Sequence, residues 1–174
     1  MLIDAYRRLI ANQYEAALST LAHCVRHCPD AHWNARIARY PFSQVVFHTL
    51  FFADFYLGRD AESFRRQPFH AENRELFADY EQLQDQEPVS TYSRAQVDRY
   101  NDFCRQKTLA TIAEETEQSL CGDSGFQRRN FTRAELHVYN IRHIQHHAAQ
   151  LILRLRIDAH VDVPWIGSGW RDPR

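Results

Sequence analysis

The sequence predicts an all-α fold, a four-helix bundle with one long crossover connection, formed as a single domain over residues 1–174. Apolar residues recur at intervals of three and four over long stretches, which is typical of amphipathic helices. Turn formers are scarce, with 5 glycines and 6 prolines, and no stretch shows the alternation of a strand. A chain of this length can bury one proper core.

Composition excludes several classes of protein. Hydrophobic residues make up 44% and charged residues 25%, as in an ordinary globular domain. The formal net charge of -1 argues against binding nucleic acid or an anionic membrane through bulk charge. No apolar run reaches the ~18–20 residues that span a bilayer, and the N-terminus lacks a signal-peptide pattern. We therefore expect a cytoplasmic protein with no nucleic-acid or membrane partner, whose 4 cysteines are free thiols.

Two helices are expected in the first third of the chain. The first covers Leu2–His27, where apolar residues keep helical spacing until Pro29 ends it. Pro29–Tyr40 is then a connection to the next helix. The second helix is expected over Pro41–Gly58, because proline favours a helix start and glycine a C-cap. This helix is apolar nearly all round and therefore buried on most sides, so His48 within it needs a polar partner.

The middle of the chain is expected to hold the crossover and the third helix. Arg59–Thr91 contains two prolines and an acidic centre, which favours a long connection with one short helix at Glu72–Tyr80. The third helix is expected over Ser93–Leu120. Ser93 and Gln96 have the spacing of a capping box, which opens a helix.

The fourth helix is expected over Ala134–Ile157. Thr132 and Glu135 repeat the capping-box spacing immediately before its first apolar residues. Beyond this helix, the tail from Asp158 contains two tryptophans, two glycines and two prolines. We expect this tail to form an ordered arm laid over the bundle.

The fourth helix carries a pair of candidate metal ligands. His143 and His147 are four residues apart, so they lie one turn apart on one face and can bind a single ion. On a helical wheel with His143 at zero, His147 falls at about 40°, on the flank of the apolar face. His146 falls at about -60°, on the solvent side, and is excluded, whereas His137 at about 120° lies inside the apolar face and is a rival. With His48 from the buried second helix, the pair makes a predicted three-histidine site.

The chemistry of this predicted site follows from its ligands. Three neutral imidazoles suit zinc, nickel, iron or cobalt. Three protein ligands leave a position for water or substrate, which is the arrangement of a catalytic site. A zincin-type protease is not expected, because Ile144 stands where the HExxH motif has its glutamate. Asp54, six residues after His48, could orient a ligand or serve as a surface or interhelix residue.

A second group of ligand-type residues lies at the end of the first helix. Its members are His23, Cys24, His27 and Cys28. Neighbouring residues on a helix point about 100° apart, so these four side chains cannot meet at one ion within a regular helix. We expect ordinary helix-end residues, with at least one of the two cysteines buried.

Three segments resemble a known family. They are FHTLFFADFYLG around His48, YNIRHIQHHAAQLILRLR around His143 and His147, and PWIGSG near the end. With these segments the sequence resembles the DinB-like family of damage-inducible proteins, which is related to bacterial thiol-dependent transferases. The resemblance implies a four-helix bundle in which His48, His143 and His147 bind a divalent metal ion. Zinc and nickel are the ions we expect first. It also implies a homodimer and a low-molecular-weight thiol as a partner.

Three functional hypotheses follow. The first is a metal-dependent enzyme, either a thiol-dependent transferase or a hydrolase acting on a small molecule, in which the ion activates a thiol or water. The alternative is a non-enzymatic metal-binding or stress-related protein on the same scaffold. The third is a plain bundle whose histidines pack or form hydrogen bonds. The sequence names no catalytic residue beyond the candidate ligands.

Overall fold

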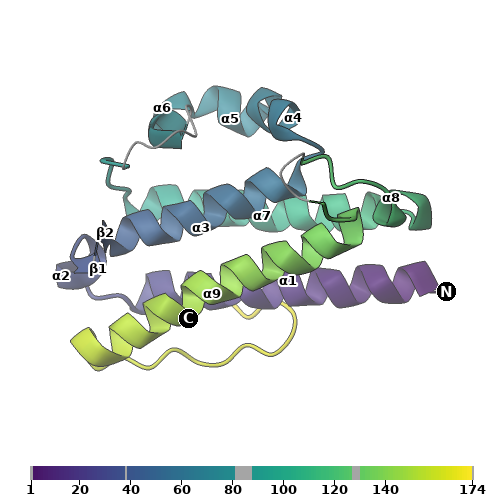
Figure 1. Ribbon diagram of the computed structural model, residues 1–174. Coiled ribbons are helices and arrows are strands. Elements are labelled where there is room, and N and C mark those ends of the chain that lie inside the picture. The colour runs from purple at the N-terminus through teal and green to yellow at the C-terminus, as the bar shows by residue number, and fades with distance from the viewer. Residues whose placement is uncertain (1, 38, 81–87, 127–129, 174) are drawn as a thin grey trace.

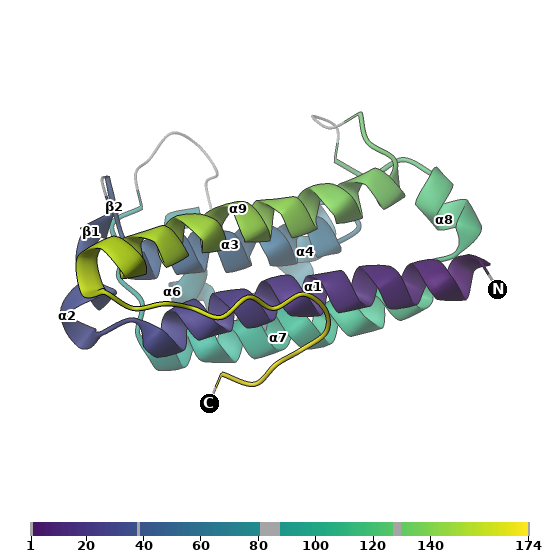
Figure 2. The ribbon, with the colours of Figure 1, turned by 90° about the horizontal axis from the view of Figure 1, so that it is seen from below.

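The computed structural model describes residues 2–37, 39–80, 88–126 and 130–173, and these form a bundle of four long helices (Figure 1). The helices are α1 (Leu2–His27), α3 (Phe42–Leu57), α7 (Arg94–Glu114) and α9 (Arg133–Ala159). Both α1 and α3 pack against α7 and α9, so the four helices surround one core (Figure 2). The all-α prediction is confirmed. No helix in the described ranges has the length and apolar character needed to cross a membrane.

The connection between α1 and α3 contains short regular elements. It forms α2 (Asp30–Trp33), followed by the antiparallel strands β1 (Arg36–Ile37) and β2 (Tyr40–Pro41). The sequence gives no sign of these strands, because two-residue strands are too short to show alternation. Trp33 is buried, and its Nε1 donates to the carbonyl of Tyr92 at 2.7 Å. This hydrogen bond ties the connection to the segment that leads into α7.

The described part of the crossover consists of short helices that lie over α3 and α7 (Figure 1). They are α4 (Ala61–Arg66), α5 (Pro68–Glu72), α6 (Arg74–Phe77) and the 3-10 turn η1 (Ala78–Tyr80). Helix therefore begins well before the single short helix predicted at Glu72–Tyr80. Pro68 opens α5 at the first helical position, where its missing N–H costs nothing. Phe64 and Phe77 are buried and contact Phe51 on α3, which fixes the crossover on the bundle.

The predicted third helix is interrupted near its end. α7 stops at Glu114, and α8 (Glu117–Cys121) is a separate helix, so the expectation of one helix over Ser93–Leu120 was wrong. Thr116 is the N-cap of α8, and its side chain accepts a hydrogen bond from the Ser119 N–H at 3.1 Å. Both predicted capping boxes, which open α7 and α9, are confirmed. The other predicted boundaries agree within two residues.

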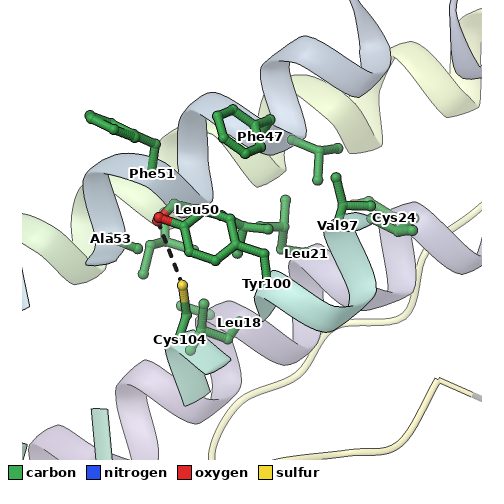
Figure 3. Close-up of a cluster of buried hydrophobic side chains, with 14 of the residues drawn as sticks. Leu18, Leu21, Cys24, Phe47, Leu50, Phe51, Ala53, Val97, Tyr100 and Cys104 are labelled. Atoms are coloured by element: carbon green, nitrogen blue, oxygen red, sulfur yellow. Dashed lines mark hydrogen bonds between the residues drawn. The ribbon is translucent and has the colours of Figure 1, made fainter. Parts of the chain in front are cut away.

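Large apolar side chains from the long helices fill the centre of the bundle. Figure 3 shows Leu18 and Leu21 from α1 beside Leu50 from α3 and Tyr100 from α7, all fully buried. Burying a side chain of the size of leucine contributes about 1.5–3 kcal/mol. The Cys104 thiol lies in the same region and donates to the Leu50 carbonyl at 3.6 Å (Figure 3). All four cysteines are free thiols, as predicted.

The C-terminal arm, residues 160–173, runs back along α1 (Figure 2). The Gly169 N–H donates to the carbonyl of Asn12 at 3.0 Å. Ser19 is fully buried, and its hydroxyl donates to the Arg171 carbonyl at 2.6 Å while accepting from the Arg171 N–H at 3.1 Å. The prediction of an ordered arm laid over the bundle is confirmed.

Candidate metal centre

Three histidines from two helices meet at the side of the bundle. His48 lies on α3, and His143 and His147 lie one turn apart on α9, which packs against α3. Each of the three offers one ring nitrogen, and these nitrogens all lie within 4.8 Å of one another. All three side chains are half-buried. The predicted three-histidine group therefore exists as a spatial cluster.

The spacing of the rings suits a single small ion. Ring centroids lie 4.7 Å apart for His143 and His147, 4.9 Å for His48 and His147, and 5.6 Å for His48 and His143. Zinc–nitrogen bonds of about 2.0–2.1 Å in a tetrahedral site place the nitrogens about 3.3 Å apart. Three such ligands leave at least one coordination position open.

Two aromatic side chains lie beside the histidines. The ring of Phe52 lies 4.8 Å from that of His48 and 5.7 Å from that of His143. Tyr80 comes from the end of the crossover, 6.3 Å from His48, and stacks on Phe51 at 4.5 Å. The crossover therefore contributes directly to the surroundings of the cluster, which the sequence did not indicate.

Burial lowers the pKa of the His48 and His147 imidazoles and so favours their neutral forms. Desolvation, and after it the charge of His147, lowers the pKa of His48 to about 4. Desolvation also lowers the pKa of His147, although the hydrogen bond from that ring to Gln150 acts in the opposite direction. A neutral imidazole has a free lone pair at one nitrogen, and this lone pair is what a metal ion requires. The donor set therefore fits a divalent ion of the zinc or nickel type.

Comparison with known proteins identifies the family. Residues 13–151 match the family model of the DinB superfamily, and all three histidines lie within this range. The chain belongs to the DinB superfamily. This confirms the resemblance drawn from the two histidine segments. The comparisons give no match to a curated protein and none to a solved structure.

The rival histidine of this DinB protein lies in a separate buried network. Both ring nitrogens of His137 are engaged, Nδ1 with the Tyr14 hydroxyl at 3.2 Å and Nε2 with Glu115 Oε1 at 3.0 Å. Glu115 also accepts from Arg133 Nε at 2.8 Å. His137 is fully buried and does not belong to the three-histidine cluster. The sequence alone could not exclude His137 from the metal site, because its partner Glu115 lies at the end of a different helix, α7.

Arg133 links this network to the helix that carries His48. Its guanidinium donates to the last carbonyls of α3, those of Tyr56, Leu57 and Gly58, at 3.2, 3.0 and 2.7 Å. The last carbonyls of a helix lie beyond the reach of its own N–H groups, so Arg133 acts as a side-chain cap. The network therefore holds α3 in place from its C-terminal end.

Asp54 serves as an interhelix residue. It is fully buried, forms an ion pair with Lys107 and accepts hydrogen bonds from Tyr100 Oη at 2.9 Å and Gln67 Nε2 at 2.7 Å. Gln67 belongs to the crossover, and the other two residues to α7. Asp54 thus ties the crossover and α7 to α3. This is the interhelix role that the sequence left open, and full burial excludes the alternative of a surface residue.

The second group of ligand-type residues in the DinB protein does not form a joint site. The rings of His23 and His27 stack on each other with centroids 5.6 Å apart. Cys24 and Cys28 are buried, and burial raises the pKa of each thiol, to about 12 for Cys24 and about 11 for Cys28. These thiols are therefore poor ligands and nucleophiles at neutral pH.

One neighbour of the cluster was missed by the sequence reasoning. The Nδ1 atom of His147 lies 3.0 Å from Gln150 Oε1, and Gln150 Nε2 lies 3.1 Å from His146 Nε2. His146 itself is exposed and outside the cluster, as predicted. The signal was present in the sequence, because residues three and four positions apart on a helix are neighbours.

Proposed function

We propose that His48, His143 and His147 bind one divalent metal ion, zinc or nickel, and that this DinB protein is a metal-dependent enzyme acting on a small molecule. One observation carries the proposal, the convergence of three half-buried imidazole nitrogens within 4.8 Å. Membership of the DinB superfamily is compatible with such a site. The ligands stand on two packed helices, which hold donor atoms more rigidly than loops do.

The reaction we favour is the attack of a low-molecular-weight thiol on a small electrophile, with hydrolysis by water as the second candidate. An ion at this position supplies Lewis acidity, which lowers the pKa of a coordinated thiol or water. Phe52 and Tyr80 lie beside His48 and offer flat apolar surface to a substrate. The preference for a thiol rests on the family resemblance.

We also propose a homodimer in the cytoplasm. The outer side of α9 exposes large apolar side chains, with Leu153 53% and Ile157 57% exposed, and such side chains favour contact with a second copy. Free thiols at all four cysteines suit a reducing compartment. Light scattering of purified protein over a range of concentrations tests the dimer.

Metal content is the first test of the proposed site. We expect about one zinc or nickel ion per chain after reconstitution and dialysis. His143→Ala and His147→Ala should each lose most of this metal while keeping helical circular dichroism. His27→Ala is the matched control outside the cluster, and His137→Gln tests the rival; both should retain the ion. Equal metal content in all four variants and wild type would contradict the site.

Turnover then separates an enzyme from a metal-binding protein. Metal-loaded protein is assayed with electrophiles and a panel of cellular thiols, and then with esters and amides. Metal-dependent turnover that is lost in His147→Ala supports the enzyme. If metal-loaded protein turns over none of these substrates, the enzymatic proposal fails and the non-enzymatic, stress-related alternative is favoured.

A further inference from the structure

Gln150 makes two contacts that together define its orientation. Its Oε1 lies 3.0 Å from His147 Nδ1, and its Nε2 lies 3.1 Å from His146 Nε2. All three residues lie on α9, where Gln150 is three positions after His147 and four after His146. Such neighbours share one side of a helix, so the contacts need no distant element to form.

The chemistry of an amide decides which atoms carry protons. A carbonyl oxygen only accepts hydrogen bonds, so the contact with Oε1 requires a proton on His147 Nδ1. An amide nitrogen only donates, so the second contact requires a lone pair on His146 Nε2. Turning the amide by 180° would reverse both requirements at once. In the orientation that the structure shows, Oε1 faces His147 and Nε2 faces His146.

We propose that Gln150 is a positioning residue of the metal centre, which holds His147 in the tautomer that presents Nε2 to the ion. The inference rests on the proposed metal site. In a neutral imidazole one nitrogen carries the proton and the other the lone pair. Because Gln150 holds the proton at Nδ1, the nitrogen left for the ion is Nε2. A hydrogen bond of this kind also limits rotation of the ring and raises the basicity of the ligand nitrogen.

The surroundings of Gln150 support this role. Its side chain is exposed, whereas His147 is half-buried between the solvent side of α9 and the other two histidines. The hydrogen bond therefore lies on the outer side of the cluster, and it leaves the inner side of the ring to His48 and His143. An exposed glutamine on a helix surface usually contributes little to folding. Its loss should thus affect the metal centre more than stability.

Two substitutions test the acceptor itself. Gln150→Leu removes the carbonyl oxygen at similar size, and we expect zinc affinity to fall about 10–100-fold. Gln150→Glu keeps an acceptor at the same place, so its zinc affinity should equal or exceed that of wild type. Gln106→Leu, an exposed glutamine on α7, is the matched control and should leave the affinity unchanged. Zinc affinity is measured by competition with a chromophoric chelator.

A second readout needs no metal. Proton–nitrogen correlation spectra of the imidazoles, assigned with His147→Ala, report which nitrogen of His147 carries the proton in metal-free protein. We expect the proton at Nδ1 in wild type and Gln150→Glu, and a shift of population to Nε2 in Gln150→Leu. Unchanged spectra together with unchanged zinc affinity in Gln150→Leu would overturn the inference. Failure of wild type to bind zinc or nickel overturns the proposed function instead, and the spectra still decide whether Gln150 sets the tautomer.

Discussion

The ion pair between Glu115 and Arg133 supports a quantitative prediction about stability. Both side chains are buried, with 7% and 9% of their surface exposed, and the carboxylate also accepts from His137 Nε2 and from Ser119 Oγ at 2.5 Å. Burial alone would raise the pKa of Glu115, but the hydrogen bonds from His137, Ser119 and Arg133 lower it to about 2. The perturbation is Glu115→Gln, which keeps the shape of the side chain and removes its charge.

The expected loss of folding stability follows from the depressed pKa of Glu115. A fall from 4.5 to about 2 corresponds to about 3 kcal/mol of folding free energy. Because the folded-state pKa is below the unfolded value, this contribution is complete at pH 7 and is lost as the pH falls from about 4.5 towards 2. We therefore expect Glu115→Gln to lower the free energy of unfolding by about 3 kcal/mol at pH 7.

Urea denaturation at pH 7 measures this loss, with a chelator present so that bound metal does not contribute. Glu114→Gln, the exposed neighbour, is the matched control and should change stability by less than about 0.5 kcal/mol. Arg133→Met should cost at least as much as Glu115→Gln, because it also removes the cap of α3. In the double variant the two losses should overlap by about 1–3 kcal/mol. Equal stability of the Glu114 and Glu115 variants, or strict additivity in the double variant, would refute the reasoning.

Three further changes probe other parts of the bundle. Lys107→Met leaves the buried Asp54 carboxylate without its counterion, so the urea midpoint should fall by an amount that corresponds to about 3–5 kcal/mol. Gly125→Ala should lower the melting temperature several times more than Gly169→Ala. Both glycines have positive φ, but a Cβ at Gly125 would lie 1.8 Å from a backbone oxygen, whereas a Cβ at Gly169 would have no atom within 4 Å. Ser19→Ala removes both hydrogen bonds to the C-terminal arm, so amide exchange in residues 160–173 should accelerate while that in the long helices stays unchanged.

The long helices could be predicted because their signals are local. Apolar periodicity and the capping boxes at Ser93 and Thr132 each depend on a few neighbouring residues, and α7 and α9 begin where these signals stand. The break after Glu114 was missed because the N-cap at Thr116 is completed by Ser119 instead of glutamate or glutamine. The crossover helices were missed for another reason, since their few buried aromatic residues are stabilised by packing against α3.

In the candidate site, too, local signals could be predicted from the sequence, and contacts that depend on the fold could not. The spacing of His143 and His147 is local, and it identified two members of the cluster. His48 could be proposed because it is the one histidine in a segment that is otherwise almost wholly apolar. The rival His137 has an equally good position on the helical wheel, and it is excluded only by Tyr14 and Glu115, whose approach depends on the fold. Tyr80 could not be foreseen either, because the crossover carries it to the site.

The proposed site has two tasks, metal binding and small-molecule binding, and different parts of the fold support them. α3 carries His48 and is fixed by Arg133 at its end and by Asp54 along its length, so the ligand positions are set by the bundle itself. Tyr80 reaches the site from the crossover, which packs on α3 through apolar contacts and through Gln67. Changes in the crossover should therefore alter which small molecules bind while leaving metal affinity intact, whereas changes at Arg133 should weaken both through α3.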